Sequence, residues 1–179
     1  MLKKILLGLA AIVAGILIVA AFQPGEFSVK RSLAIAAPAQ ALFEQVNDHR
    51  KFVVWNPWLK LDPNAKNTFS GPASGAGSVC SWEGNSDVGV GSATITESKP
   101  GERVRLRMDW KKPMEGTSTV DFTFKPEGGK TLVTWHIYGV NNYMGKVMCL
   151  FMNMDRMIGG QFEIGLASLK VLAEGGAKK

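Results

Sequence analysis

Hydrophobic and polar residues alternate along much of the chain after residue 26, and this pattern predicts strands. The clearest alternation runs from Arg103 to Lys111, where Val104, Leu106 and Met108 share one face with Trp110 and polar residues share the other. Five further strands are expected, each bounded by Gly, Pro or Asn, at residues 27–35, 78–83, 88–98, 116–125 and 131–138. Together they predict an antiparallel meander with one dry face.

Helical spacing takes over in two places. After the first strand we expect two short helices, one over residues 39–47 and a second that Asp48 caps and that ends at Trp55, before Pro57. Residues 62–78 are rich in Pro, Gly, Ser and Asn, so we expect them to be irregular.

The last segment predicts one long helix from Tyr143 to about Leu172, which Gly175 and Gly176 end before a solvated tail, 175–179, that carries Lys178 and Lys179. A stripe at 3–4 spacing marks its apolar face: Met144, Met148, Phe151, Ile158, Phe162, Leu166 and Leu169. Because a sheet with one dry face needs a cover, we expect this helix to pack on it.

This order of elements resembles the START-like (SRPBCC, helix-grip) superfamily, in particular its polyketide cyclase/dehydrase and lipid-transport branch. The resemblance extends from Phe27 to about Glu174. Its specific parts are the first strand leading to Ala37-Pro38, then Trp55-Asn56-Pro57-Trp58 with Asp62-Pro63, Gly75-Ala76-Gly77 running into Trp82, and the closing helix. It implies an α+β helix-grip fold, with a curved antiparallel sheet wrapped on the C-terminal helix and a ligand cavity between them.

The N-terminus carries eighteen residues, Ile5 to Phe22, without a charged or strongly polar side chain. As a helix this run spans about 27 Å, close to the ~30 Å hydrocarbon core of a bilayer. We expect residues 1–26 to be an uncleaved signal anchor and linker, with Lys3 and Lys4 in the cytoplasm and the 27–174 domain on the extracytoplasmic side of the cytoplasmic membrane. The alternative is a signal sequence cleaved after Val19-Ala20-Ala21, which would release a secreted or periplasmic protein.

Composition narrows the function. The net charge of +6 suits an anionic membrane surface, while the basic residues form no single run, so we expect no nucleic-acid partner. The sequence has no Cys-x-x-Cys or His-Glu-x-x-His motif and only two histidines, so we expect no metal and no cofactor. Gly75-x-Gly77 and Gly89-x-Gly91 lack the third glycine of a dinucleotide site and are read as strand ends or bulges. Cys80 and Cys149 are either buried thiols or a disulfide.

Large apolar side chains are the best candidates for a ligand site, although each could instead be core filler. Trp110 and Trp135 are expected to point inward, and His136 and Tyr138 outward. The methionines crowding one half of the last helix suit varied apolar partners. The candidate ligand-binding residues are Trp55, Trp58, Trp82, Met108, Trp110, Phe122, Trp135, Met144, Met148, Phe151 and Asp155.

Asp155 interrupts the apolar stripe and is the one weak candidate for catalysis. A carboxylate there is expected to hydrogen-bond to His136, Tyr138, Asn85 or a backbone amide, to act as a polar anchor or acid/base group, or to face water if the register differs. Three functions follow: a membrane-tethered binding or carrier protein for a hydrophobic small molecule or lipid, a cyclase/dehydrase-type enzyme on a hydrophobic substrate, or a protein-interaction module. The carrier is the leading hypothesis, and enzyme activity is favoured less than binding without catalysis.

Overall fold

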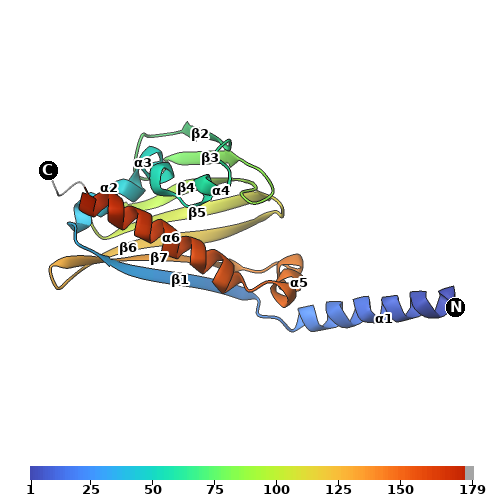
Figure 1. Ribbon diagram of the computed structural model, residues 1–179. Coiled ribbons are helices and arrows are strands. Elements are labelled where there is room, and N and C mark those ends of the chain that lie inside the picture. Colours follow the sequence, from blue (N-terminus) through green and yellow to red (C-terminus); the bar gives the residue numbers. More distant parts are fainter. Residues whose placement is uncertain (176–179) are drawn as a thin grey trace.

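A seven-stranded antiparallel sheet forms the body of the molecule in the computed structural model, which describes residues 1–175 (Figure 1). The strand order is β1-β7-β6-β5-β4-β3-β2, so the meander is continuous except that β1 lies at the edge beside β7. The strands are β1 (Glu26–Ile35), β2 (Lys66–Ser70), β3 (Val79–Glu83), β4 (Val90–Lys99), β5 (Arg103–Lys112), β6 (Gly116–Glu127) and β7 (Lys130–Val140).

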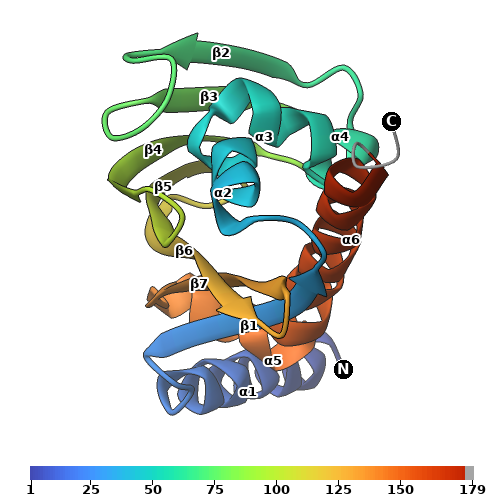
Figure 2. The same cartoon turned by 90° about the vertical axis from the view of Figure 1, so that its left-hand side faces the viewer.

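One helix precedes the sheet at the N-terminus, and the other helices follow β1 or β7 in the chain. They are α1 (Leu2–Ala21), α2 (Ala39–Asn47), α3 (His49–Trp55), α4 (Trp58–Leu61), α5 (Tyr143–Phe151) and α6 (Met154–Gly175). Figure 2 shows α2, α3 and α6 on the concave side of the curved sheet. The α+β helix-grip fold expected from the sequence is confirmed, as are the strands and both short helices, including the Asp48 cap, whose carboxylate accepts from the Arg50 amide at 2.8 Å.

The expectation that residues 62–78 are irregular is wrong in part. Lys66–Ser70 form the edge strand β2, which pairs with β3. Its polar positions are exposed because an edge strand has a neighbour on one side only, so it lacks the apolar pattern that marks the central strands.

The single long C-terminal helix is also wrong, because the chain breaks between α5 and α6. Met152 adopts an extended conformation, and the Asn153 side chain accepts a hydrogen bond from the Arg156 amide at 2.9 Å, which caps the start of α6. The expected tail 175–179 lies almost wholly outside the described residues. The break separates α5, which packs on α1, from α6, which packs on the sheet.

The core forms where α6 meets the sheet. Trp135 on β7 stacks on Phe162 of α6, with ring centroids 4.2 Å apart and an interplanar angle of 12°. Around this pair, Phe122 and Trp55 pack edge-on or tilted, and both are almost fully buried. The inward orientation expected of Trp135 is therefore confirmed.

Two glycines let α6 approach the sheet closely. A Cβ at Gly165 would lie 2.7 Å from Cζ3 of Trp135 and 3.0 Å from Cδ of Pro57, two rigid rings. A Cβ at Gly159 would lie 2.2 Å from the guanidinium of Arg31, which crosses the helix at that point. The helix face toward the core is thus small where the sheet side chains are large.

The convex face of the sheet carries most of the charged side chains of the central strands, and they pair with each other. Arg105 contacts Asp121 at 2.7 Å, and Arg103 contacts Glu97 at 2.6 Å. Tyr138 donates to Asp121 from the same face, at 3.3 Å, so its outward orientation is confirmed. Each of these two arginines is therefore paired with a neighbouring carboxylate.

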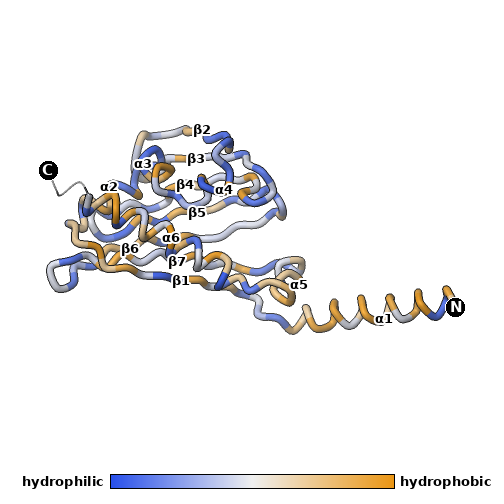
Figure 3. Tube along the Cα trace, in the orientation of Figure 1, coloured by the Kyte–Doolittle hydropathy of each residue, from blue (hydrophilic) through white to orange (hydrophobic). Residues whose placement is uncertain are grey.

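Helix α1 extends away from the sheet and is apolar along its whole length after Lys4 (Figure 3). An 18-residue stretch of this twenty-residue helix has a mean hydropathy of 2.5, and almost all side chains of the helix are exposed. Length and composition therefore make it a candidate for a single-pass membrane anchor or a signal sequence.

The close approach at Gly165 can be tested with a matched pair of substitutions in the same helix. Gly160 has no atom within 4 Å of an added Cβ. We expect Gly160→Ala to raise the free energy of unfolding by about 0.5–1 kcal/mol, because Ala is the better helix former. Gly165→Ala should lower it by about 1–3 kcal/mol through overpacking against Trp135. Urea denaturation of the detergent-solubilised chain measures both, and equal effects would contradict the assigned packing.

His49, at the start of α3, links stability to pH. Its side chain is 2% exposed, and burial lowers the pKa of the imidazole. Below the ordinary pKa of about 6.5, the unfolded chain takes up a proton that folded His49 resists. We therefore expect the free energy of unfolding to fall as the pH drops from 7 toward 5.

His49→Gln should flatten this dependence. His136→Gln is the comparison. Burial also lowers the pKa of His136, which lies half-buried beside Ser28, 2.8 Å from its hydroxyl, so this variant should flatten the dependence less than His49→Gln does. Urea midpoints at pH 7 and pH 5 check the prediction, and an unchanged slope in His49→Gln would exclude His49 as its source.

Candidate functional site

The concave face has a filled end and an open end. At the filled end, six rings pack together with centroid distances between 4.2 and 6.1 Å: Phe52, Trp55, Trp58, Phe122, Trp135 and Phe162. Helices α3, α4 and α6 supply four of these rings, and strands β6 and β7 supply the other two. Large aromatic rings in T-shaped and stacked contacts leave little free volume there.

The open end comprises the inward-facing side chains nearer the α5 end of the sheet, and we define it by Trp82, Met108, Trp110 and Ser118. Trp82 and Trp110 pack edge-on with centroids 5.5 Å apart, and both remain half-buried, as does Met108. The Trp110 indole donates to the Ser118 hydroxyl at 2.9 Å, which fixes the ring across β5 and β6. Apolar surface is therefore accessible here.

Small residues lie beside these rings. Gly91 is paired with both Trp82 and Trp110, and a Cβ there would lie 2.7 Å from Cζ2 of Trp82. Ala93 opposes Met108, and Gly139 opposes Ser118. The inward-facing side chains of the sheet beside these rings are therefore short, whereas the buried positions farther along the strands carry Val, Ile and Leu. The interpretation of Gly89-x-Gly91 as a bulge is confirmed by the register shift between Val90 and Gly91.

The structure distributes the sequence-predicted residues over three places. Trp55, Phe122 and Trp135 are core residues, while Trp58 joins that core from α4 but stays half-buried. Trp82, Met108 and Trp110 form the open end. The remaining residues flank the helix break: Met144, Met148 and Phe151 are on α5, before it, and Asp155 is in the first turn of α6, after it.

The expectation that Met144, Met148 and Phe151 continue the sheet-facing stripe is wrong. They belong to α5, which is turned away from the stripe of α6 by the break at Met152. Met144 and Phe151 are 56% and 69% exposed. Their part in ligand binding stays a prediction.

Asp155 is not buried in the apolar stripe, and none of the expected partners bonds to it. Its side chain is 62% exposed and accepts two hydrogen bonds from Arg31, at 2.9 and 2.8 Å. This contact lowers the pKa of the carboxyl group. Asp155 lies outside the apolar stripe because it is in the first turn of α6, where its side chain reaches the edge strand β1. The helix dipole also favours a carboxylate at that position. A carboxylate held ionised in this way is a poor general acid.

Arg31 holds Asp155 in position, and the sequence interpretation did not identify this role. It also contacts Glu163 at 2.7 Å, so one guanidinium joins β1 to two turns of α6. The signal was present, since Arg31 falls in the inward register of Phe27, Val29 and Leu33. Ser118 was missed in the same way, although it continues the inward series of Val120 and Phe122.

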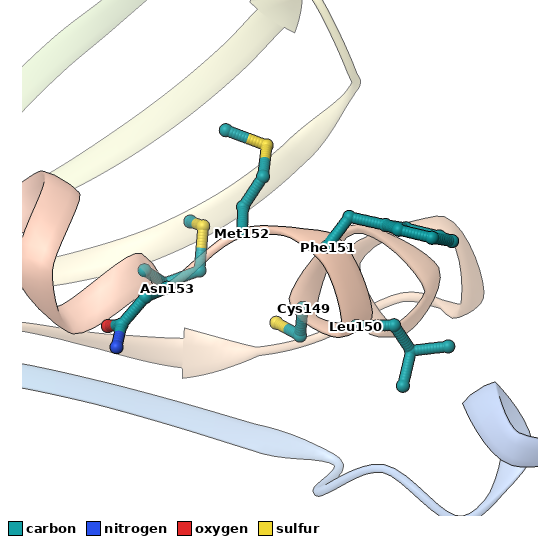
Figure 4. A pocket seen from close by; sticks show the side chains of 6 residues that line it. Cys149, Leu150, Phe151, Met152 and Asn153 are labelled. Atoms are coloured by element: carbon teal, nitrogen blue, oxygen red, sulfur yellow. The ribbon is translucent and has the colours of Figure 1, made fainter.

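Two hollows open on the surface of the described residues. One, of about 430 Å³, is lined by Cys149–Met154 at the α5–α6 connection. In Figure 4, Met152 projects to one side of this connection and Leu150 to the opposite side. The other, of about 570 Å³, lies at the far end of the sheet between residues 36–39 and 126–131. The first hollow therefore lies where the chain passes from α5 to α6.

Polar chemistry at the site is sparse. Cys80 and Cys149 are free thiols, and burial raises the pKa of Cys80 to about 11. Within residues 1–175, no three His, Cys, Asp or Glu side chains come close enough together to hold a metal ion. The Trp135 indole N–H is buried and has no hydrogen-bond partner among the described residues.

The chain after α1 matches a known protein family over almost its whole length. A family model described as polyketide cyclase / dehydrase and lipid transport matches residues 26–174. None of the curated proteins matches the sequence.

Solved structures share the fold at low sequence identity. A Chromobacterium violaceum protein is 13% identical, with a TM-score of 0.61, and the match covers 82% of this chain and 96% of that one. A Rhizobium leguminosarum protein is 16% identical, with a TM-score of 0.56 and coverage of 83% and 95%. The di-domain ARO/CYC BexL is 14% identical, with a TM-score of 0.61 over 87% of this chain and 52% of its own. Identities this low show the fold alone.

The role of Asp155 can be tested by Asp155→Asn. We expect a small loss of thermal stability at low salt that shrinks as salt is added, because the pair with Arg31 is exposed and screened. The content of bound apolar ligand should not change. Asp87→Asn is the matched control, since no ion pair of Asp87 occurs in the described part of the chain. Loss of ligand in Asp155→Asn alone would restore the polar-anchor hypothesis.

Proposed function

Since the chain belongs to the polyketide cyclase/dehydrase and lipid transport family, we propose that it is a membrane-tethered carrier for a hydrophobic small molecule or lipid. The ligand would lie between the sheet and α6, at the open end of the concave face. The half-buried Trp82–Trp110 pair beside Met108, over a floor of small residues, is the observation that carries this proposal.

The chemistry of the open end supports an apolar ligand. Indole and thioether surfaces bind acyl chains or rings without directional demands. Burying about 300 Å² of apolar ligand surface would contribute roughly 7 kcal/mol before the costs of binding.

The tether rests on α1. Four residues, Phe22–Gly25, connect it to β1, and they span at most about 13 Å when extended. A bilayer-spanning α1 would therefore hold the sheet against the membrane surface. Lys3 and Lys4 would keep the N-terminus in the cytoplasm and place the domain outside the cytoplasmic membrane. A cleaved signal sequence is the alternative for the same segment.

A cyclase-type enzyme is the second candidate, because the family description includes cyclases and BexL is an ARO/CYC protein of the same fold. Such an enzyme needs a placed acid or base. The open end as defined here offers one hydroxyl, Ser118, which is bonded to Trp110. Asp155 is engaged by Arg31, so the geometry favours the carrier.

The proposal is tested by native mass spectrometry and lipid extraction on the full chain purified in detergent. We expect an apolar mass to co-purify with the wild type. In Met108→Gln/Trp110→Gln its occupancy should fall at least tenfold, because burying unpaired amides costs about 1–3 kcal/mol each.

Val171→Gln is the control, since Val171 is 73% exposed on α6. Lipid that surrounds α1 would persist in both variants, so only the difference between them reports the site. A wild-type chain with no co-purifying mass, which also fails to take up fluorescent fatty acids, would exclude the carrier and favour a protein partner.

A further inference from the structure

We propose that α5 is an interfacial membrane helix that lies in the headgroup region of the bilayer spanned by α1. Its exposed apolar side chains would contact lipid, and the hollow at Cys149–Met154 would open onto the membrane instead of onto water. This inference rests on the proposed tethering by α1, but it does not depend on which ligand is carried.

The contact between α5 and α1 sets the depth. The Tyr143 hydroxyl donates to the carbonyl oxygen of Leu17 at 2.6 Å, and the two helices pack together over several residues. Leu17 lies four residues before the end of α1, which is about 6 Å along the helix axis. If α1 crosses the hydrocarbon core, the start of α5 is therefore held near the boundary between acyl chains and headgroups. Tyr is enriched at that level of a membrane.

The exposed surface of α5 is apolar where water would otherwise meet it. Tyr143 is 48% exposed, Met144 56% and Phe151 69%. Met152 extends this surface at 38% exposure. The helix α5 packs on α1, whose own side chains are exposed and apolar, so exposed apolar residues of the two helices lie next to each other.

Basic residues lie on α5 and on the strand that leads to the turn touching its start. Lys146 is on α5, and Lys111 and Lys112 end β5, immediately before the β5–β6 turn, which also carries Glu115. That turn touches α5, because the Asn142 side chain donates to the carbonyl oxygen of Glu115 at 3.2 Å. Lysines next to an apolar surface favour anionic headgroups, a complementarity that a second copy of this basic chain would lack.

The consequence concerns the route of the ligand. The hollow of about 430 Å³ is lined by the residues that end α5 and begin α6. With α5 in the headgroup layer, an apolar molecule would pass from the bilayer to this hollow without crossing water, a step that would otherwise expose its whole apolar surface.

The experiment places an environment-sensitive fluorophore on the full chain in vesicles of phosphatidylethanolamine and phosphatidylglycerol. In a Cys80→Ala/Cys149→Ala background, NBD is attached to Phe151→Cys, to Met144→Cys as a second probe of α5, or to Val171→Cys. Val171 is a matched control, since it is 73% exposed but lies near the far end of α6. Vesicle flotation verifies that each chain is membrane-bound.

Because an interfacial helix sinks its apolar face about 5–10 Å into the headgroup boundary, we expect doxyl-labelled lipid to quench the α5 probes roughly twofold. The probe at position 171 should respond to aqueous iodide and not to doxyl lipid. Floating protein whose α5 probes are iodide-accessible overturns the inference and leaves the tether intact. Probes on α5 that quench one another between chains, with no response to doxyl lipid, assign the surface to a second copy and also overturn it.

Failure of the chain to float overturns the tether and this inference together. Quenched α5 probes on a chain that holds no apolar ligand would support the inference while excluding the carrier function. The two proposals therefore fail by different observations.

Discussion

The rest of the structure depends on the stacking of Trp135 on Phe162. It joins the middle of β7 to the middle of α6, at a centroid distance of 4.2 Å. So close an approach requires the missing side chain at Gly165, and the edge-on rings of Trp55 and Phe122 then complete the cluster. At the other end of the concave face, Trp82 and Trp110 are only half-buried, so their apolar surface remains accessible. The ring cluster and this pair thus divide the concave face into a closed part and an accessible part.

A second constraint acts at the edge of the sheet. Arg31 points inward from β1, where an apolar residue would be expected, and it pairs with Asp155 and Glu163, which lie about two turns apart on α6. Its guanidinium fills the space that Gly159 leaves. The pair with Asp155 gives the carboxylate at the start of α6 a structural partner on β1. It also orients the start of α6 relative to β1.

Much of the fold could be predicted from the sequence because the strong patterns are local. Alternation placed β5 and β6, and the Asp48 cap placed α3, since each depends on neighbours a few residues apart. The strand β2 and the break at Met152 could not be predicted in this way. An edge strand lacks an apolar face, and Met152 has no Gly or Pro beside it to mark the end of a helix. Partners distant in sequence, such as Arg31 and Asp155, become visible only after the topology is known.

The joint at Met152 and Asn153 separates two mechanical units. Helix α6 is locked to the sheet by the aromatic stack, whereas α5 is held by α1 through Tyr143. Cellular membranes differ in thickness by several ångströms, and an embedded helix tilts or shifts to match the bilayer around it. With one unbroken C-terminal helix, such a shift would pull Phe162 away from Trp135. With the chain broken as it is, we expect α5 to follow the bilayer while the grip on the sheet stays unstrained.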